Sequence, residues 1–311
     1  MIKVGVVGVG NMGRHHARVY YELSKEGHGV KLVGVVDKDP ARARAVAEAY
    51  GTKAYTDHRN LVKEGIDAVS IAVPTKLHRN ITLDFIRSNV HVLVEKPIAT
   101  TYSEAVEMAE EAKKFGVILM VGHIERFNPA VQKLKELIDR GMLGRPLVLT
   151  ARRVGPMPPQ IKDVEVTLDL AIHDIDVIRY VTDREIRRVI VKGGSALHPM
   201  NYDDYAVVLM ELGGGVIGVV EANWLTPYKL RKLYVTGDKA IAELDYMQQT
   251  LLIHDKEFAI DVKIEKSEPL KNELKHFLEC IIEGKKPLIN GEEAANLMKI
   301  IEEALNQVKA F

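Results

Sequence analysis

The chain has 311 residues, of which 47% are hydrophobic and 28% are charged, as in ordinary globular proteins. Lysine plus arginine equals aspartate plus glutamate, at 43 each, so no overall positive field predicts binding to nucleic acid or to an anionic membrane. No apolar run approaches the ~20 residues needed to span a bilayer, and the single cysteine, Cys280, excludes an internal disulfide. The chain opens on a strand-like run with no signal-peptide features, so we expect a cytoplasmic protein.

Residues 1–122 alternate strand-like and helix-like segments. Mostly apolar, strand-like runs lie at 2–10, 30–37, 67–74, 91–96 and 117–123, and polar, helix-prone stretches such as 41–51 and 103–116 lie between them. Nearly continuous apolar strands separated by helices are typical of a parallel sheet covered on both faces. The spacing fits right-handed β-α-β crossovers, so the sequence predicts a doubly wound, Rossmann-type α/β domain over residues 1–122.

The pattern changes after residue 123. A helix is predicted at 129–141, a strand at 146–154, a proline-rich loop at 155–160 and a helix at about 167–181. Strand-like runs then follow one another without helices, at 186–194, 205–212, 215–224, 232–237, 240–246 and 250–255. Short turns between such runs predict a large, open antiparallel sheet. Two helices, at about 268–283 and 291–309, complete an α+β domain over 123–311, and the last of them can pack back on the first domain.

A glycine-rich turn follows the first strand. The run "VGVGNMGRHHARVY" places Gly8, Gly10 and Gly13 in a G-x-G-x-x-G pattern between a strand and a helix, with Asn11 and Met12 inside the turn. In a dinucleotide-binding turn the first glycine permits the tight bend, the second lets the backbone approach a pyrophosphate, and the third lets helix pack on strand. The free N–H groups at the helix start would then face the phosphates. Glycines also serve plain turns, so the pattern depends on this strand–helix context.

The second strand ends in Asp37, a little over 20 residues beyond Gly13. A carboxylate at that place can accept hydrogen bonds from both ribose hydroxyls and would repel the 2′-phosphate of NADP, so NAD is favoured. The alternative is that Asp37 only caps the helix that starts at Pro40. Lys38 and Arg42 could hold a phosphate, which leaves some use of NADP open.

Two further strands end at the same predicted edge of the sheet. Val73-Pro74-Thr75 ends one strand, and His78 follows it; these residues would border the nicotinamide, since ligands bind beyond the carboxyl ends of parallel strands. A strand-terminating turn, with His78 starting a helix, is the alternative. Glu95 and Lys96 end the next strand, before a proline. The lysine there is either an ordinary surface charge or a placed functional group.

The predicted helix at 167–181 carries Asp169 and His173 four residues apart, which puts both side chains on one face. Oxidation of an alcohol by hydride transfer needs a base for the hydroxyl proton, and histidine titrates nearest neutral pH. The neighbouring Asp174 and Asp176 also allow a solvated acidic face. A metal site using Asp169, His173 and Asp176 is a further alternative, but no other ligand cluster is evident and we expect no metal.

In this order the motifs resemble the Gfo/Idh/MocA family of oxidoreductases, over essentially the whole chain. The resemblance rests on the glycine turn, Asp37, Val73-Pro74-Thr75, Glu95-Lys96-Pro97, "GHIERFNP" at 122–129 and Asp169-x-x-x-His173. It implies that Lys96 points into an active site and that the Lys96–Pro97 peptide is cis. It also implies that His173, oriented by Asp169, removes the proton while hydride passes to NAD, and that Lys96 stabilises the developing oxyanion. Which of Lys96 and His173 is the formal base stays open.

Several stretches are similar to a narrower branch that oxidises the 3-hydroxyl of UDP-N-acetylglucosamine. A diphosphate would suit a group of basic and polar side chains, and Tyr228 could stack on a base. The substrate-binding candidates are Arg126, Asn128, Arg153, Tyr228 and Arg231, with Arg152, Lys229 and Lys232 nearby. A solvated surface or structural ion pairs would explain the same charges. A dehydrogenase for inositol or another free polyol, an enzyme for the uronic acid of the nucleotide sugar, and a non-catalytic NAD-sensing regulator remain alternatives.

The resemblance also implies a homodimer or homotetramer that assembles through the C-terminal sheet. Neither a nucleic-acid partner nor a membrane partner is expected.

Overall fold

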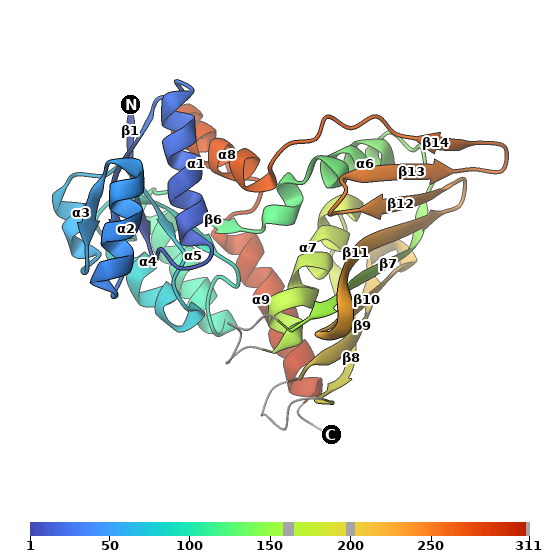
Figure 1. The fold of residues 1–311 in the computed structure, drawn as a ribbon. Coiled ribbons are helices and arrows are strands. Elements are labelled where there is room, and N and C mark those ends of the chain that lie inside the picture. Colours follow the sequence, from blue (N-terminus) through green and yellow to red (C-terminus); the bar gives the residue numbers. More distant parts are fainter. Residues whose placement is uncertain (158–164, 197–202, 309–311) are drawn as a thin grey trace. The chain divides into compact units, whose positions relative to one another are not determined.

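The computed structural model describes residues 1–157, 165–196 and 203–308, which form two compact units (Figure 1). The first unit comprises Met1–Ile124 and Leu270–Lys299, and the second comprises Glu125–Pro269 and the residues from Ile300 onward. Residues 270–299 therefore join the first unit, although they follow the second sheet in sequence. Within that unit the N–H of Val121 donates to the carbonyl of Ile289, and Lys271 forms an ion pair with Glu26.

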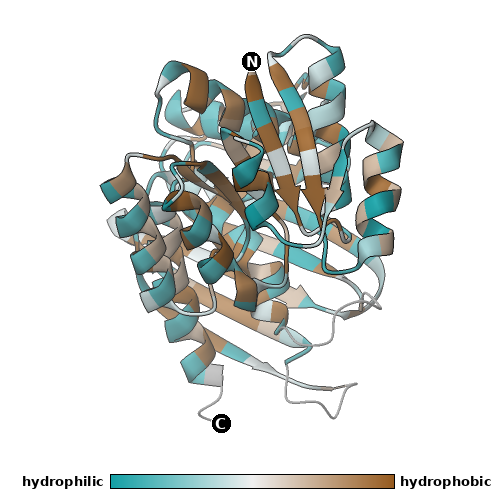
Figure 2. Ribbon diagram, turned by 90° about the vertical axis from the view of Figure 1, so that its left-hand side faces the viewer, coloured by the Kyte–Doolittle hydropathy of each residue, from teal (hydrophilic) through white to brown (hydrophobic). Residues whose placement is uncertain are grey.

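The first unit contains a parallel sheet, as predicted. Its strands within the described residues lie in the order β3-β2-β1-β4-β5-β6, and every neighbouring pair is parallel. The strands are β1 (Ile2–Val7), β2 (Val30–Val36), β3 (Lys53–Tyr55), β4 (Ala68–Ile71), β5 (His91–Glu95) and β6 (Leu119–Gly122). Valine, leucine and isoleucine dominate the central strands, which are buried on both faces; Figure 2 shows most of β1, which begins at the label N, in the hydrophobic colour.

Helices connect these strands. They are α1 (Gly13–Lys25), α2 (Pro40–Tyr50), α3 (Arg59–Lys63), α4 (His78–Ile86) and α5 (Tyr102–Phe115). Two further helices follow the second sheet in sequence, α8 (Pro269–Glu283) and α9 (Gly291–Val308), and α9 belongs to the first unit up to Lys299. Local sequence explains several boundaries. Asp39 accepts hydrogen bonds from the N–H groups of Ala41 and Arg42 and caps α2, Pro40 starts it, and Gly51 ends it with a positive φ of 62°. The predicted last helix, 291–309, ends at Val308, and residue 309 lies outside the described residues.

The second unit is built on one large sheet. Its strands among the described residues lie in the order β14-β13-β12-β11-β7-β10-β9-β8. They are β7 (Pro146–Pro156), β8 (Ile186–Gly194), β9 (Tyr205–Leu212), β10 (Val216–Asn223), β11 (Leu225–Gly237), β12 (Ile241–Asp245), β13 (Thr250–His254) and β14 (Ala259–Asp261). Neighbours are antiparallel except β7 and β10, which pair in parallel, so the sheet is mostly rather than wholly antiparallel.

Two strands are longer than their sequence suggested. β7 continues through Gly155 and Pro156, which were expected to begin a loop; residues 158–160 of that loop lie outside the described residues. β11 starts at Leu225 and contains Pro227, which cannot donate a ladder hydrogen bond. The register between β11 and β7 shifts between Leu225 and Leu230, and this irregularity accommodates the proline.

One face of this sheet is covered by helices and the other face is exposed. The helices are α6 (Pro129–Asp139) and α7 (Ile172–Thr182), preceded by a π-helix, η3 (Thr167–Ala171). α6 contacts β12 and β13, and α7 contacts β7 and β10. On β9 the burial alternates residue by residue, because successive side chains point to opposite faces. The uncovered face carries the exposed apolar side chains Tyr205, Val207, Leu209, Ile217, Tyr234 and Ile241.

Candidate active site

The glycine turn lies between β1 and α1, at the carboxyl end of the sheet. A Cβ added to Gly13 would lie 1.7 Å from the carbonyl oxygen of Gly8, so only glycine fits there. Gly8 has a positive φ of 82° and tolerates no side chain either. Gly10 is different, because a Cβ there would meet no protein atom within 4 Å. The Met12 side chain accepts no hydrogen bond from the first N–H groups of α1.

Asp37 ends the second strand beside this turn. Its carboxylate accepts hydrogen bonds from the N–H groups of Val9 and Asp39, both at 3.0 Å, and from Arg42 at 3.2 Å. Since Asp39 is the residue that caps α2, the alternative role of Asp37 as that cap is wrong. Arg42 is also within 3.5 Å of Asp39, so its charge is already shared between two carboxylates. The turn, the helix start and a fixed carboxylate together fit a dinucleotide with free ribose hydroxyls.

Lys96 follows β5 at the same edge, and the Lys96–Pro97 peptide is cis, as the resemblance implied. The carboxylate of Glu95 contacts both this turn and helix α1. The N–H of Lys96 donates to Glu95 Oε2 at 3.3 Å, and the other oxygen, Oε1, lies 2.9 Å from Nε2 of the fully buried His16 on α1. Burial would raise the pKa of the Glu95 carboxyl, but the hydrogen bond and charge of His16, together with Lys96, lower it overall. Glu95 is therefore an anion that anchors the turn, and contact with the cofactor stays a prediction.

Asp169 and His173 lie in the second unit, on the same continuous helical segment. Asp169 is in the π-helix η3 and His173 in the first turn of α7, and both are half-buried. π-Helical turns are rare and are frequent at functional sites. His123, in the same motif as Glu125 and Asn128, is buried in the first unit. Lys96 belongs to the first unit, and Asp169 and His173 belong to the second.

The two other aspartates of α7 are buried in ion pairs, so the alternative of a solvated acidic face is wrong. Asp174 is 0% exposed and accepts two hydrogen bonds from Arg153, at 2.6 and 3.3 Å. Asp176 is 1% exposed and accepts two from Arg126, at 2.8 and 2.7 Å. The guanidinium of Arg126 also lies over the ring of Tyr180. Such paired forks are the geometry in which buried charges are tolerated.

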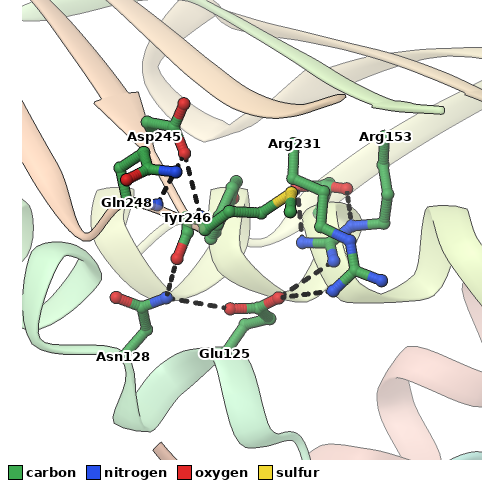
Figure 3. Close-up of polar contacts among 9 residues, drawn as sticks. Glu125, Asn128, Arg153, Arg231, Asp245, Tyr246 and Gln248 are labelled. Carbon is green, nitrogen blue, oxygen red and sulfur yellow. Dashed lines mark hydrogen bonds and ion pairs between the residues drawn. The ribbon is translucent and has the colours of Figure 1, made fainter. Parts of the chain in front are cut away.

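Arg153 and Glu125 form the centre of a polar network on the covered face of the sheet (Figure 3). Arg153 donates to Glu125 Oε1 at 2.9 Å, and Asn128 donates to the other oxygen of Glu125 at 3.2 Å and to the carbonyl of Tyr246 at 3.0 Å. Burial alone would lower the pKa of Arg153, but the carboxylates of Asp174 and Glu125 raise it overall. Only 1% of the surface of Arg153 is exposed, so this side chain acts on a ligand indirectly, by positioning its neighbours.

Arg231 is the neighbour that reaches outward. It lies on β11 directly opposite Arg153 on β7, its side chain is 36% exposed, and its closest carboxylate oxygen in Figure 3, on Glu125, is 4.0 Å away. Burial, and then the positive charge of Arg153, lower the pKa of Arg231. Tyr228, in the irregular part of the same strand, is 62% exposed.

Other candidate cations lie elsewhere on the sheet. Arg152 forms an ion pair with Glu221 at 2.8 Å, and Lys232 forms one with Glu243. Because side chains alternate along a strand, these two residues face away from Arg153 and Arg231. Six basic residues were considered from the sequence. Among the described contacts, only Arg231 and Lys229 of these six have no carboxylate oxygen closer than 4.0 Å.

The described residues support neither a metal site nor a membrane-spanning helix. No group of three or more histidine, cysteine, aspartate or glutamate side chains there could hold a metal ion, and Asp176, one of the ligands considered, is bound by Arg126. Among the helices of the described residues, none combines the length and apolar character needed to cross a bilayer.

Sequence reasoning missed the roles of two buried residues. Glu125 lies inside the quoted "GHIERFNP" motif, and its place three residues before the N-cap asparagine Asn128 was the available signal. His16 is fully buried on α1 and contacts Glu95, 79 positions away in sequence. No local pattern could have indicated a contact over that separation.

The glycine turn, the strand-end aspartate and the parallel sheet together define an NAD-binding oxidoreductase. The profile described as "Oxidoreductase family, NAD-binding Rossmann fold" matches residues 2–123, and the one described as "GFO/IDH/MocA C-terminal domain" matches residues 131–243. The chain belongs to the Gfo/Idh/MocA oxidoreductase family, and its cofactor is NAD.

The chain is similar over its whole length to characterised members of this family. It is 29% identical to UDP-N-acetylglucosamine 3-dehydrogenase of Acidithiobacillus ferrooxidans, covering 100% of this chain and 98% of that protein. It is 30% identical to scyllo-inositol 2-dehydrogenase (NAD(+)) of Bacillus subtilis, covering 99% and 94%. A solved structure of the Acidithiobacillus enzyme superposes with a TM-score of 0.91 over 100% of this chain and 98% of that one. The two identities are too close to separate a nucleotide sugar from a free polyol.

Replacing Gly10 by alanine separates cofactor binding from folding. A methyl group there meets no protein atom, so the free energy of unfolding should change by less than about 1 kcal/mol, the ordinary scale for Gly-to-Ala changes. The methyl group would occupy space that a pyrophosphate needs, and we expect the Kd for NAD, measured by calorimetry, to rise at least about tenfold. Gly213→Ala, between β9 and β10 in the second unit, is the control, because its φ is not positive and its added Cβ would meet no atom closer than 3.9 Å. Unchanged NAD affinity in Gly10→Ala would contradict this placement of the phosphates.

Proposed function

We propose that the chain is an NAD-dependent dehydrogenase that oxidises a secondary hydroxyl of a sugar, and that this hydroxyl is the 3-hydroxyl of UDP-N-acetylglucosamine. One observation carries the choice of a nucleotide sugar. Arg231 stands directly opposite the buried Arg153 and is partly exposed, with its nearest carboxylate in the network at 4.0 Å. The whole-length similarity to a UDP-N-acetylglucosamine 3-dehydrogenase supports the same choice.

The pair of arginines is a feature that needs an explanation. Like charges directly opposite one another on a sheet are destabilising, and here burial adds to the cost. Asp174 and Glu125 neutralise Arg153, which leaves Arg231 as the side chain through which an anion would gain most. A diphosphate can accept several hydrogen bonds from one guanidinium, and the exposed ring of Tyr228 offers a stacking surface for a base. A free polyol would use neither feature.

The chemical roles follow from the residue types. Bound NAD supplies the hydride acceptor. His173, with Asp169 on the preceding turn, is assigned the removal of the hydroxyl proton, and Lys96 the stabilisation of the developing oxyanion. Glu95 and His16 hold Lys96 in place, and the buried pairs of Asp174 and Asp176 hold the helix that carries His173. Arg126, Arg153 and Asn128 thus act on the substrate indirectly, by fixing the scaffold around Arg231.

A second candidate is a dehydrogenase for inositol or a related free polyol, favoured by the 30% identity to scyllo-inositol 2-dehydrogenase. The same catalytic residues would serve it. A regulator that binds NAD without turnover is a different class, and the presence of Lys96, Asp169 and His173 together argues against it.

We also propose that copies of the chain associate through the exposed face of the large sheet. Its exposed apolar side chains come from β9 and β10 and, beyond β7, from β11 and β12. Exposed apolar side chains gathered on one face are typical of an interface between subunits.

Lys96→Met and His173→Asn should separate chemistry from cofactor binding. Each keeps a side chain of similar size while removing the charge or the base, so we expect kcat to fall at least about 100-fold. The Kd for NAD should change less than about threefold, since the glycine turn and Asp37 are untouched. Lys114→Met and His254→Asn, both exposed positions, are the matched controls. If either active-site variant kept wild-type turnover, its assigned role would be wrong.

Arg231→Gln should decide between the two substrates. NADH formation is followed with UDP-N-acetylglucosamine, its uronic acid, N-acetylglucosamine and myo-inositol, with an aminotransferase present to consume the 3-keto sugar. For a UDP-sugar we expect KM to rise about tenfold or more, because a charge-assisted contact is lost, while Arg231→Lys retains part of it. Arg145→Gln, an exposed arginine 3.9 Å from its carboxylate, is the control. Turnover of myo-inositol alone, unaffected by Arg231→Gln, would establish the polyol candidate instead.

The sheet interface predicts a specific change in mass. Light scattering of the wild-type chain should report two or more copies, and Leu209→Glu should shift the population toward a single copy because it places charge in an apolar contact. Ile282→Glu is the control, because Ile282 is also an exposed apolar residue but lies on α8 of the first unit. A wild-type mass of one chain would refute the proposal.

A further inference from the structure

His78 begins α4 directly after the turn at Thr75–Leu77, and only 1% of its surface is exposed. Sequence reasoning counted it among the residues that touch the cofactor. Both ring nitrogens are instead used inside the protein. Nδ1 lies 2.9 Å from the carbonyl oxygen of Pro97, and Nε2 lies 2.8 Å from the carbonyl oxygen of Val73. The ring therefore connects two separate strand ends.

Each of these strand ends leads to a part of the site. Val73 lies against the glycine turn, since a Cβ added to Gly8 would come within 2.7 Å of Val73 Cγ1 and 2.6 Å of the Ala72 carbonyl oxygen. Pro97 is the residue after Lys96, and its carbonyl belongs to the turn that presents this lysine. His78 is thus the side chain whose two hydrogen bonds reach the loop on the cofactor side and the lysine turn on the other.

The chemistry of the ring limits how it can hold both. Each partner is a carbonyl oxygen, so each contact needs an N–H from the ring, and a neutral imidazole has one. Burial lowers the pKa of His78, although the two carbonyls and the charge of Glu95 oppose this. At neutral pH the ring then donates to one carbonyl at a time and can exchange between its two tautomers.

We infer that His78 is a positioning residue that ties the loop beside the cofactor, through Val73, to the turn that carries Lys96, through Pro97. The catalytic consequence at Lys96 rests on the proposed function, whereas the tie to Val73 concerns NAD binding alone. Because the buried ring lies between the two segments, the position of the Val73 loop limits the position of the turn from which the lysine projects.

Two substitutions each keep one of the two hydrogen bonds. The amide nitrogen of His78→Asn falls near the position of Nδ1 and can still donate to Pro97, whereas that of His78→Gln falls near Nε2 and can still donate to Val73. His78→Leu removes both. His91→Asn is the matched control, because His91 is at the opposite end of β5 and its Nδ1 accepts from the N–H of Ile118, a role that the asparagine oxygen retains.

The Kd for NAD is measured by calorimetry, and amide hydrogen exchange is measured over residues 95–101. We expect His78→Asn to weaken NAD binding about fivefold with exchange of the lysine turn unchanged, on the usual scale of one hydrogen bond. We expect His78→Gln to leave NAD affinity within about twofold, and to speed exchange in the turn about fivefold. With a substrate that the wild-type enzyme turns over, kcat should fall in His78→Gln and KM for NAD should rise in His78→Asn.

Equal effects of asparagine and glutamine on affinity, exchange and kcat would overturn the inference, because a merely structural histidine has no reason to separate them. So would wild-type NAD affinity in His78→Asn, or wild-type exchange in His78→Gln. If no sugar or polyol is oxidised by the wild-type chain, the proposed function fails, while the affinity and exchange measurements still decide whether His78 makes both ties.

Discussion

Parallel pairing of β1 with both β2 and β4 is the constraint on which the cofactor side of the structure depends. The strand order reverses at this point, so connections leave the sheet in opposite directions and open a crevice beyond the carboxyl ends. The glycine turn follows β1, Asp37 follows β2, the Val73 loop follows β4 and Lys96 follows β5. The pairing of the strands thereby brings residues that are far apart in sequence to one edge of the sheet.

Buried charge plays the corresponding part in the second unit. Two arginines and three carboxylates are removed from water beside the sheet, which is costly unless each charge is paired with good geometry. The forks from Arg153 to Asp174 and from Arg126 to Asp176 meet that condition, and Glu125 joins Arg153 to Asn128 and so to the start of α6. Such a network contributes little net stability compared with apolar packing. Its effect is to fix α7, and with it His173, in one register against β7.

Local patterns predicted much of this architecture and of the cofactor site. The apolar strands, the glycines and the strand-end residues Asp37 and Lys96 depend on neighbours in sequence, and the motifs were therefore readable. The sequence could not show the parallel pairing of β7 with β10, because both partners look like ordinary strands. Nor could it show that Arg153 and Arg126 are enclosed by aspartates 21 and 50 positions later, since burial is decided by tertiary contacts. Among the predicted substrate-binding residues, Arg126, Asn128 and Arg153 are buried, whereas Arg231 is partly exposed.

The helix that carries His173 shows how support and chemistry are divided along one short run. In "HDIDVIR", Asp174 and Asp176 are fully buried and serve arginines, while His173, one position before the first of them, is half-buried. The π-helical turn before it widens the helix where Asp169 lies, so the side chains on either side of the junction need not follow a regular α-helical face. Loss of either buried aspartate would leave an arginine unpaired in the interior and weaken the fold. The same division holds in the first unit, where His16 and Glu95 are buried supports and Lys96 is the group they present.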